Sequence, residues 1–487
     1  MSVRRSLVLS IAQNHSILVI RLLSLVIVSR LVQPHELGVF LIAQGLVTLG
    51  LMFADFGIQQ YVVSASDTSR IHEARALGAG MLTTCVAIVA ELALAFVTPS
   101  SVLDEKVRLA IALLIGASVL TPFTSVAKSV LQRDMRYAEL YWIATLAALA
   151  GVGATIVLAL GGFGFLSLVG GAMTETLVTS AIALSRHFPP WPTIAGASAV
   201  LGFGGVITAM HGVKQAGDAA VPLQIEVGLG LGVVGILGRA QSILLLFDRL
   251  VVDALSHVLL PLLAARRRTG ADITGIRPRM IAGLTATAWP FFGLLALLAP
   301  QVIDILLGPQ WGEAAPPLRI LCLAGLLLPF HALIMPYLVA LGIAHRFLPW
   351  QAAIQVVKLV LVLAAALRSL ELVCVVLVLE RAAATILGQR LLFSALGPLP
   401  RKLLTDVIAS ACVSVVAIAT GAVSISLLGP CAGAVVGIVV CTAAALPAWL
   451  AAVFLLRHPL LQEFTQVRTA ACDTLLRWRN SRRAGLN

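Results

Sequence analysis

Residues 37–46 read LGVFLIAQGL, and residues 234–243 read VGILGRAQSI. Gly38 matches Gly235 and Gln44 matches Gln241 at a single offset of 197 residues (235 − 38 = 197), and most of the other matched positions are apolar. A chain that repeats itself after about two hundred residues is expected to consist of two halves with one architecture. The most informative mismatch in the repeat is an aliphatic side chain, Ile42, against a cation, Arg239.

The composition around this repeat is that of a membrane protein. Of the 487 residues, 59% are hydrophobic and only 11% are charged, and the mean hydropathy is +1.00. Soluble domains carry roughly 25% charged residues. Apolar segments of eighteen or more residues recur along the chain, and their non-alternating pattern predicts membrane-spanning helices rather than the strands of a barrel. The net charge of +12 does not indicate a nucleic-acid partner, because the arginines lie at the ends of the predicted helices.

Fourteen spans account for these segments, and together they predict an all-α integral membrane protein. They cover residues 6–32, 36–64, 76–97, 107–131, 139–161, 164–185, 195–217, 233–263, 280–306, 318–342, 349–368, 371–396, 404–428 and 431–456. Proline-rich stretches divide the spans into two lobes of six helices and two extra C-terminal helices. The expected parts are an N-lobe (1–185), a cytoplasmic linker (186–194), a C-lobe (195–396), the last two spans (397–456) and a basic amphipathic cytoplasmic tail (457–487).

Lysines and arginines in the connections predict how the chain lies in the membrane. Of the 34 in the chain, 21 fall on one side of the predicted spans and 4 on the other. Cytoplasmic connections carry the excess of positive charge, so both termini are expected in the cytoplasm. Because each half has six spans, the second half enters the membrane in the same direction as the first, which predicts a parallel repeat about an axis along the membrane normal.

Two other sequence features carry little functional information. The seven cysteines are scattered and form no C-x-x-C pair, so neither a disulfide framework nor a metal site is expected. The segment Ser2–Leu9 has a faint likeness to a twin-arginine signal. The residues that follow it include polar side chains and contain no small-residue cleavage site, so we interpret the segment as part of a retained first span.

Polar side chains inside the spans are the candidates for function. A charge at mid-membrane costs roughly 2.5–3.5 kcal/mol on insertion scales, so it usually faces a cavity or a partner. At about 100° per residue, spans 1, 2, 7, 8 and 11 each carry a polar stripe. We expect these stripes to meet around one central cationic cavity. The candidate substrate-binding residues are Arg21, Arg239, Lys358, Arg249, Lys214, Gln44, Gln241 and Asn14.

Cations in this cavity would favour an anionic substrate, since arginine forms bidentate, charge-assisted hydrogen bonds with phosphate. Two buried carboxylates, Asp55 and Asp253, are candidates for binding a coupling ion, H⁺ or Na⁺. The simpler interpretation, which we favour, is that each pairs with an arginine. No cofactor is expected.

Several short segments resemble segments of the polysaccharide flippases of the Wzx type. These flippases belong to the MOP superfamily (multidrug/oligosaccharidyl-lipid/polysaccharide transporters). They follow one another in the order of that family across spans 1–10. These segments are 29–40 (SRLVQPHELGVF), 53–58 (FADFGI), 131–137 (LQRDMRY), 235–241 (GILGRAQ), 308–312 (GPQWG) and 318–321 (LRIL). The sequence departs from the family in 210–232, where the usual polar run is sparse, and at Leu237, where the family has an aromatic residue.

The resemblance implies a V-shaped bundle of two six-helix lobes in the bacterial inner membrane. It also implies a transporter, not an enzyme, that moves a polyprenyl-diphosphate-linked oligosaccharide to the periplasmic leaflet by alternating access, with membrane lipids and polysaccharide polymerase or export machinery as further partners. Under this resemblance Arg21 and Arg239 are the first candidates for contact with the diphosphate, and Lys358 is the third.

Two alternatives stay open at this point. A MATE-like exporter of drugs or small molecules belongs to the same superfamily, although its cavity would be expected to suit cations. A membrane-embedded polysaccharide polymerase or glycosyltransferase needs a reactive outer loop, and the predicted outer loops are short, with few ionisable groups.

Overall fold

The computed structural model describes residues 3–55, 57–64, 69–99, 103–252, 259, 262–263, 265–269, 272–428 and 433–461. Within these ranges, the side chains of residues 3–15, 53, 54, 60, 64, 199, 201–211 and 250 are not described. The described part of the chain is helical and contains no strand, as the all-α prediction requires.

The first half of the chain folds into helices whose bounds follow the predicted apolar segments. They are α1 (Val3–Leu31), α2 (Pro34–Asp55), α3 (Ile58–Ser64), α4 (Arg70–Val97), α5 (Glu105–Ser118), α6 (Thr121–Arg133), α7 (Tyr137–Leu160) and α8 (Phe165–Arg186). Two predicted spans are broken. Gly57, with φ +77°, separates α2 from α3, and α5 and α6 meet at a bend of 47° next to Pro122, which has no N–H to donate to the turn before it.

The second half repeats this pattern with longer helices and more breaks. Its elements are α9 (Ala197–Leu229), α10 (Leu231–Phe247), η1 (Asp248–Val252), α12 (Ile276–Leu297), α13 (Ala299–Leu306), η2 (Pro309–Ala314), α14 (Ala315–Leu326), α15 (Leu328–His331), α16 (Ile334–Leu341), η3 (Ala344–Arg346), α17 (Leu348–Ala366), α18 (Leu370–Leu396), α19 (Arg401–Leu428) and α20 (Ala434–Leu455). The predicted seventh span was too short at its C-terminal end. Helix α9 continues to Leu229, where Gly230 at φ +90° ends it.

Eight helices of the described chain are long and apolar enough to cross a membrane, or ten if the two bent pairs each count as one span. The protein is therefore a multi-pass integral membrane protein. Of the remaining predicted spans, α10 is apolar but has only 17 residues, and α1, α9 and α18 are not among the ten. The number fourteen stays a prediction.

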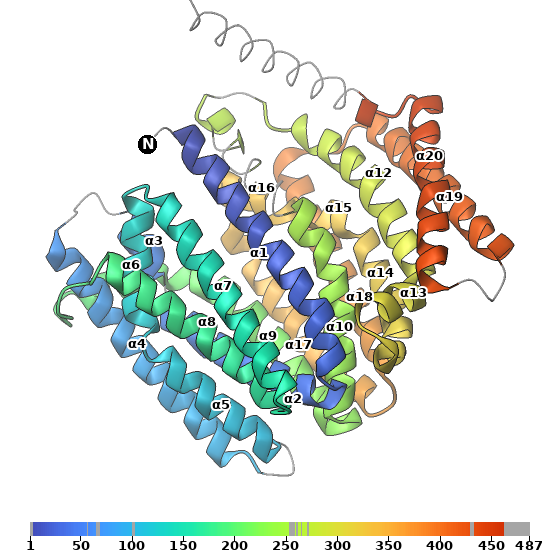
Figure 1. Cartoon of the computed structure of the whole chain (residues 1–487). Coiled ribbons are helices and arrows are strands. Elements are labelled where there is room, and N and C mark those ends of the chain that lie inside the picture. Colours follow the sequence, from blue (N-terminus) through green and yellow to red (C-terminus); the bar gives the residue numbers. More distant parts are fainter. Residues whose placement is uncertain are drawn as a thin grey trace, which may run out of the picture. The chain divides into compact units, whose positions relative to one another are not determined.

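The chain divides into two compact units, which we call unit 1 and unit 2. Unit 1 contains Met1–Leu250, Leu306–Pro317 and His345–Glu380, and unit 2 contains Val251–Ile305, Leu318–Ala344 and Arg381–Asn487. In unit 1, α7 packs along α8, α1 along α7, and α9 along α17; the first two pairs can be followed in Figure 1. The predicted lobe boundaries are not tested by this division and stay predictions.

The repeated stretch forms a close helix crossing between α2 and α10 in unit 1. A Cβ atom on Gly38 would lie 2.0 Å from the carbonyl oxygen of Leu231, and a Cβ on Gly235 would lie 2.0 Å from that of Pro34. Pro34 and Leu231 are themselves matched by the offset of 197 (231 − 34 = 197). Gly38 packs on Leu231, the repeat counterpart of Pro34, and Gly235 packs on Pro34 itself. The two contacts are equivalent under the offset, so the sequence repeat is also a repeat in the structure.

A third contact fixes the direction of this crossing. A Cβ on Gly238 would lie 2.2 Å from Cδ1 of Leu41, and Leu41 and Gly238 are again matched by the offset of 197. In a symmetric antiparallel pair, the residue numbers of the two contacting positions would add up to the same sum in every contact. The three contacts described here do not share one sum. Helices α2 and α10 are therefore a parallel pair about a pseudo-twofold axis, in agreement with the prediction that both halves enter the membrane the same way up.

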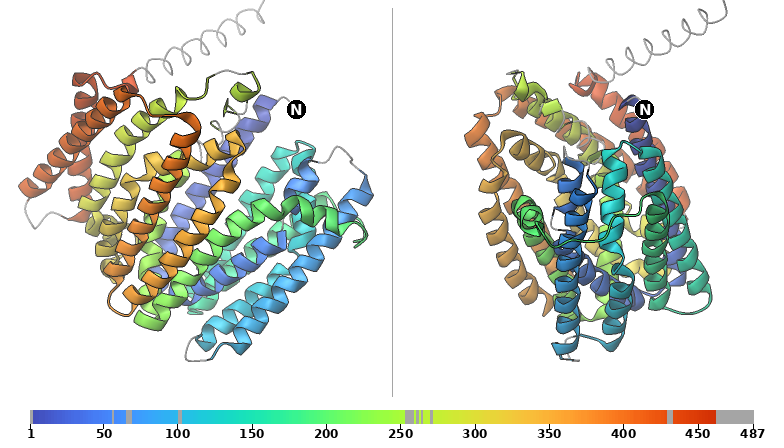
Figure 2. Two further views of the ribbon diagram at one scale, coloured as in Figure 1. Left: turned by 180° about the vertical axis from the view of Figure 1, so that it is seen from behind. Right: turned by 90° about the vertical axis from the view of Figure 1, so that its left-hand side faces the viewer.

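Unit 2 is held together by polar contacts between otherwise apolar helices. Helix α12 packs on α19, and α19 packs on α20; α19 and α20 lie side by side in Figure 1 and Figure 2. The Thr285 hydroxyl of α12 donates to Ser410 Oγ of α19 over 2.8 Å, and the Trp449 indole of α20 donates to the carbonyl of Ala286 over 2.9 Å. Hydroxyl and indole contacts of this kind join helices where packing alone has little driving force.

Just beyond α20, a buried histidine completes this cluster. His458 Nε2 lies 2.9 Å from Ser410 Oγ, and its Nδ1 accepts a hydrogen bond from the backbone N–H of Leu460 over 3.2 Å. Because Nδ1 accepts, the ring is neutral with its proton on Nε2. Burial lowers the pKa of His458 below its usual value, which favours the same neutral form.

Candidate functional site

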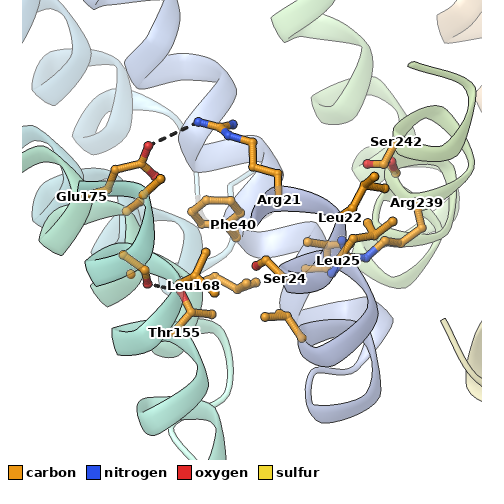
Figure 3. Close-up of a pocket in the computed structure, with 18 of the residues that line it drawn as sticks. Arg21, Leu22, Ser24, Leu25, Phe40, Thr155, Leu168, Glu175, Arg239 and Ser242 are labelled. Carbon is orange, nitrogen blue, oxygen red and sulfur yellow. Dashed lines mark hydrogen bonds and ion pairs between the residues drawn. The ribbon is translucent and has the colours of Figure 1, made fainter. Parts of the chain in front are cut away.

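Within unit 1, a cavity of about 320 Å³ lies between α1, α2, α7, α8 and α10. We call it the arginine cavity because three arginines from the predicted site, Arg21, Arg239 and Arg249, line it. Ser24 and Ser242 add hydroxyl groups from α1 and α10. Figure 3 shows Arg21 and Arg239 reaching it from these two helices. The structure thus brings residues of the predicted spans 1 and 8 to one cavity, and their role in substrate binding stays a prediction.

The first of these arginines is paired. Arg21 Nη2 lies 3.2 Å from Glu175 Oε1 of α8, and both side chains are about half exposed, 50% and 41%. Phe40 of α2 lies beside this pair (Figure 3). An ion pair with this exposure is weakly held, because water competes for both charges. Arg21 can therefore exchange its carboxylate partner for an incoming anion.

The second arginine is buried against an aromatic ring. Arg239 is only 7% exposed, and its guanidinium carbon lies 5.4 Å from the ring centroid of Trp311. Such a cation–π contact stabilises the charge by about 0.5–2 kcal/mol. Among the described residues, Nε of Arg239 has no hydrogen-bond partner and the guanidinium forms no ion pair. A buried guanidinium of this kind has unused donors at the cavity wall.

Trp311 reaches Arg239 because the short helix η2 packs into unit 1, although the helices on either side of it belong to unit 2. The indole N–H of Trp311 donates to the carbonyl of Ser29 at the end of α1 over 2.7 Å, and Gln310 Nε2 donates to the same oxygen. Trp311 is fully buried. The GPQWG segment thus ties the end of α1 to α10 and sets the position of the Arg239 side chain.

A second cavity, of about 540 Å³, adjoins the first within unit 1. We call it the hydroxyl cavity, because serine and threonine side chains of α5, α6 and α8 form much of its wall, together with Gln44 and Lys128. The two cavities share Arg21, Phe40 and Glu175, so the Arg21–Glu175 pair stands where they join.

The predicted cations of α9 and α17 belong to a separate cluster. Lys358 Nζ lies 2.8 Å from Asp218 Oδ1, and Lys214 forms an ion pair with Asp218 Oδ2. The Lys358 side chain is 1% exposed and that of Asp218 is 43% exposed. Gln355, one helical turn from Lys358, donates to Glu380 over 3.3 Å. Neither lysine lines the arginine or the hydroxyl cavity, so the single cavity predicted from the stripes was too inclusive.

This cluster and the Arg21 pair occupy matched positions of the repeat. Asp218 follows Arg21 by the same offset (218 − 21 = 197). Arg21 forms a salt bridge to Glu175 of α8, and Asp218 forms salt bridges to Lys214 of its own helix and to Lys358 of α17. The two halves thus carry ion pairs of reversed charge at one matched position.

The other predicted residues have less defined surroundings. Gln44 lines the hydroxyl cavity and donates to Thr48 over 3.1 Å, whereas Gln241 lines neither cavity. The cation whose charge acts on Asp55 of α2 is a lysine, Lys128, and not the predicted arginine. The side chain of Asn14 and the whole of Asp253 lie outside the described residues.

Three residues of the site were not predicted from the sequence, namely Glu175, Lys128 and Trp311. Each lies in a separate span or loop and shows no stripe of its own, so only the fold brings it to the cavities. Among the described residues, no group of three or more His, Cys, Asp or Glu side chains is placed to hold a metal ion.

Comparison with known proteins bears on what this geometry is for. A family model described as "Polysaccharide biosynthesis protein" matches residues 27–316, which is more than half of the chain. The chain belongs to this polysaccharide biosynthesis protein family. The match runs from α1 to α14 and includes all the arginines of the arginine cavity except Arg21.

One curated relative is the lipopolysaccharide biosynthesis protein WzxC of Escherichia coli (strain K12), with 21% identity over 319 residues. That match covers 63% of this chain and 63% of the relative, which is less than two thirds of its length. Together with the family model, this similarity supports the resemblance to Wzx-type flippases.

Solved structures with the same fold are transporters. The lipid II flippase MurJ in an inward closed conformation has a TM-score of 0.76 at 14% identity, covering 93% of this chain and 99% of that one. An inward-facing multidrug resistance MATE family transporter of the MOP superfamily has a TM-score of 0.61 at 17% identity, covering 77% and 94%. The family member described here thus has the fold of a membrane flippase or transporter, and its relatives are not enzymes.

Proposed function

We propose that this protein flips a polyprenyl-diphosphate-linked oligosaccharide across the bacterial inner membrane by alternating access. The observation that carries the proposal is the arginine cavity, a space of about 320 Å³ lined by Arg21 and by a buried Arg239 with unused donors. A diphosphate is the part of such a lipid that would use these donors, since the arginine fork matches phosphate oxygens.

Family and fold support the class of substrate without naming it. The relative from E. coli is named for lipopolysaccharide biosynthesis, and the flippase with the same fold is named for lipid II, which is a lipid-linked substrate. In this chain the sugar and diphosphate would travel through the cavities of unit 1 while the polyprenyl tail stays in the bilayer. The N- and C-termini would both face the cytoplasm, and polysaccharide polymerase or export machinery would receive the product.

Coupling to an ion gradient is the least constrained part of this proposal. Asp55 is attracted to Lys128, and a carboxylate engaged with a lysine is a poor site for Na⁺. We therefore propose that Asp55 acts as an ion-pair partner and that any coupling to H⁺ or Na⁺ uses another group. No cofactor is part of the mechanism.

The test is transport by the purified protein in vesicles loaded with a labelled polyprenyl-diphosphate oligosaccharide. Arg239→Ala removes the buried guanidinium and is expected to slow flipping about tenfold or more, since a charge-assisted hydrogen bond contributes roughly 1.5–3 kcal/mol. Arg239→Lys should retain part of the rate, because an ammonium keeps the charge but loses the bidentate fork. Arg368→Ala, at an exposed position at the end of α17, is the matched control and should flip at the wild-type rate.

Wild-type flipping by Arg239→Ala would contradict the role of the arginine cavity. The alternative, a MATE-like exporter, makes a different prediction in the same vesicles: efflux of cationic drugs with no movement of the lipid. In a deletion strain, the flippase predicts accumulation of a lipid-linked oligosaccharide facing the cytoplasm, whereas the exporter predicts altered drug resistance alone.

A further inference from the structure

The hydroxyl cavity has more acceptor hydroxyls in its wall than the arginine cavity. Ser118, Thr176, Thr179 and Ser180 each donate their single proton to a carbonyl four residues earlier, over 2.7–3.0 Å. Thr124 has two acceptors within reach, the carbonyl of Leu120 at 3.0 Å and Ser180 Oγ at 2.8 Å. A hydroxyl has one proton and two lone pairs. Once the proton is used in this way, the oxygen can still accept a hydrogen bond but has nothing left to donate.

Other groups in the wall have the same bias. The carboxylate of Glu175 accepts only, and one of the two N–H groups of the Gln44 amide donates to Thr48. Ser118 also lies four residues before Pro122, which has no N–H for its carbonyl. The donors of the wall are Lys128, Arg21 and the second N–H of Gln44, fewer groups than the hydroxyl acceptors. The cavity is therefore rich in acceptors, and it suits a ligand with many hydroxyl donors.

The position of the cavity restricts the class of ligand further. It joins the arginine cavity at Arg21, Phe40 and Glu175, so a group bound there is next to a diphosphate held by Arg21 and Arg239. In a lipid-linked glycan, the unit bonded directly to the diphosphate is a sugar, with a hydroxyl-rich edge and an apolar C–H face. Phe40 at the junction offers an aromatic ring for that face, and the cavity volume of about 540 Å³ lies within the roughly 300–1,000 Å³ of small-molecule sites.

From the acceptor-rich wall and its junction with the arginine cavity, we propose that the hydroxyl cavity binds the first sugar of the lipid-linked glycan, the one attached to the diphosphate. This inference rests on the proposed function. The sugar hydroxyls donate to the threonine and serine oxygens of α6 and α8, and the ring packs on Phe40. The cavity thereby distinguishes a loaded lipid carrier from the bare polyprenyl diphosphate that remains after the glycan has been transferred.

The test measures binding of two probes to the purified protein in detergent. One probe is undecaprenyl diphosphate, and the other is the same lipid carrying one sugar, in separate preparations with glucose and with N-acetylglucosamine. The variant Ser125→Ala/Thr176→Val/Thr179→Val removes three cavity hydroxyls at nearly constant volume. We expect it to bind the sugar-bearing probe about tenfold or more weakly than the wild type, from three hydrogen bonds of ordinary strength, and to bind the bare lipid unchanged.

The matched control is Thr83→Val/Thr174→Val/Ser185→Ala. These hydroxyls also donate to carbonyls of their own helices, but none of them lines either cavity. The control should bind all the probes as the wild type does. A wild type that binds bare and sugar-bearing lipids equally, or a cavity variant that loses affinity for both alike, overturns the sugar site.

Lipid binding by Arg239→Ala distinguishes the proposed diphosphate site from the proposed sugar site. If this variant loses the bare lipid while the cavity triple variant behaves as the wild type, the diphosphate site stands and the sugar site falls. If the wild type binds neither lipid, the proposed flippase function falls, and the sugar site falls with it.

Discussion

Replacement of Gly38 by alanine tests the parallel crossing of α2 and α10. The added Cβ would lie 2.0 Å from the carbonyl oxygen of Leu231, whereas carbon and carbonyl oxygen in close helix contacts are about 3.3–3.6 Å apart. The helices would have to separate by about 1.3 Å (3.3 − 2.0). A gap of 0.5–1 Å already removes about a quarter to a half of the dispersion energy of each contact.

The expected loss in the free energy of unfolding is about 1–3 kcal/mol, the usual cost of overpacking. The matched control is Gly153→Ala in α7, where an added Cβ would meet nothing within 4 Å. That variant should gain up to about 1 kcal/mol from the higher helix propensity of alanine. Urea or thermal unfolding of both variants in one detergent makes the comparison.

The pseudo-twofold axis adds a sharper prediction for the double variant. Gly235→Ala alone should cost about as much as Gly38→Ala, because its Cβ would meet the carbonyl of Pro34 at the same 2.0 Å. Both clashes need the same two helices to move apart. The double variant should therefore cost clearly less than the sum of the single variants. Additive losses, or a Gly38→Ala protein as stable as Gly153→Ala, would refute the close crossing.

Three further perturbations test other contacts. Asp218→Asn leaves the buried Lys358 without its carboxylate and should lower the free energy of unfolding by about 3–5 kcal/mol. Adding Lys358→Met to this variant should restore most of the lost stability. A double variant that is no more stable than Asp218→Asn would contradict the pairing. Because the pKa of His458 is lowered in the folded state, the unfolded state binds a proton on this residue more readily. His458 therefore contributes its full stability above the unfolded pKa of about 6.5, and this contribution is lost as the pH falls toward the lower folded pKa. The free energy of unfolding measured between pH 8 and pH 5 should show this loss, and His458→Gln should make the pH dependence flatter. Trp311→Phe keeps an aromatic ring beside Arg239 but removes the indole N–H and should cost about 1 kcal/mol in thermal unfolding. Unfolding at the wild-type temperature would show that the hydrogen bond to Ser29 does not stabilise the fold.

Much of the architecture follows from local patterns in the sequence. Apolar length predicts the membrane helices. The ten-residue repeat predicts two matched segments, and the contacts at Gly38 and Gly235 show that the helices carrying them, α2 and α10, cross in parallel. The errors lie where single residues interrupt a pattern. Pro122 bends one predicted span, and Gly230 rather than a loop near residue 217 ends α9.

The candidate site is harder to predict for a physical reason. A helical stripe shows that polar groups share a face, but it does not show which other helix they meet. Arg21 and Glu175 are 154 residues apart in sequence, and Lys358 is neutralised by Asp218 across 140 residues. The stripes predict one cavity for all four cations, whereas in the structure Arg21 and Arg239 line one cavity and Lys214 and Lys358 lie in another cluster.

The reciprocal contacts of Gly38 and Gly235 resemble those of a homodimer. In a twofold homodimer, residue A of one copy packs on residue B of the other, and residue B packs on residue A. Any charge near the axis of such a dimer occurs twice and cannot be altered on one side alone. Here both copies belong to one chain, so matched positions can differ: Ile42 stands in one copy and Arg239 in the other. At this position the helix pair has a cation on one side of its axis only.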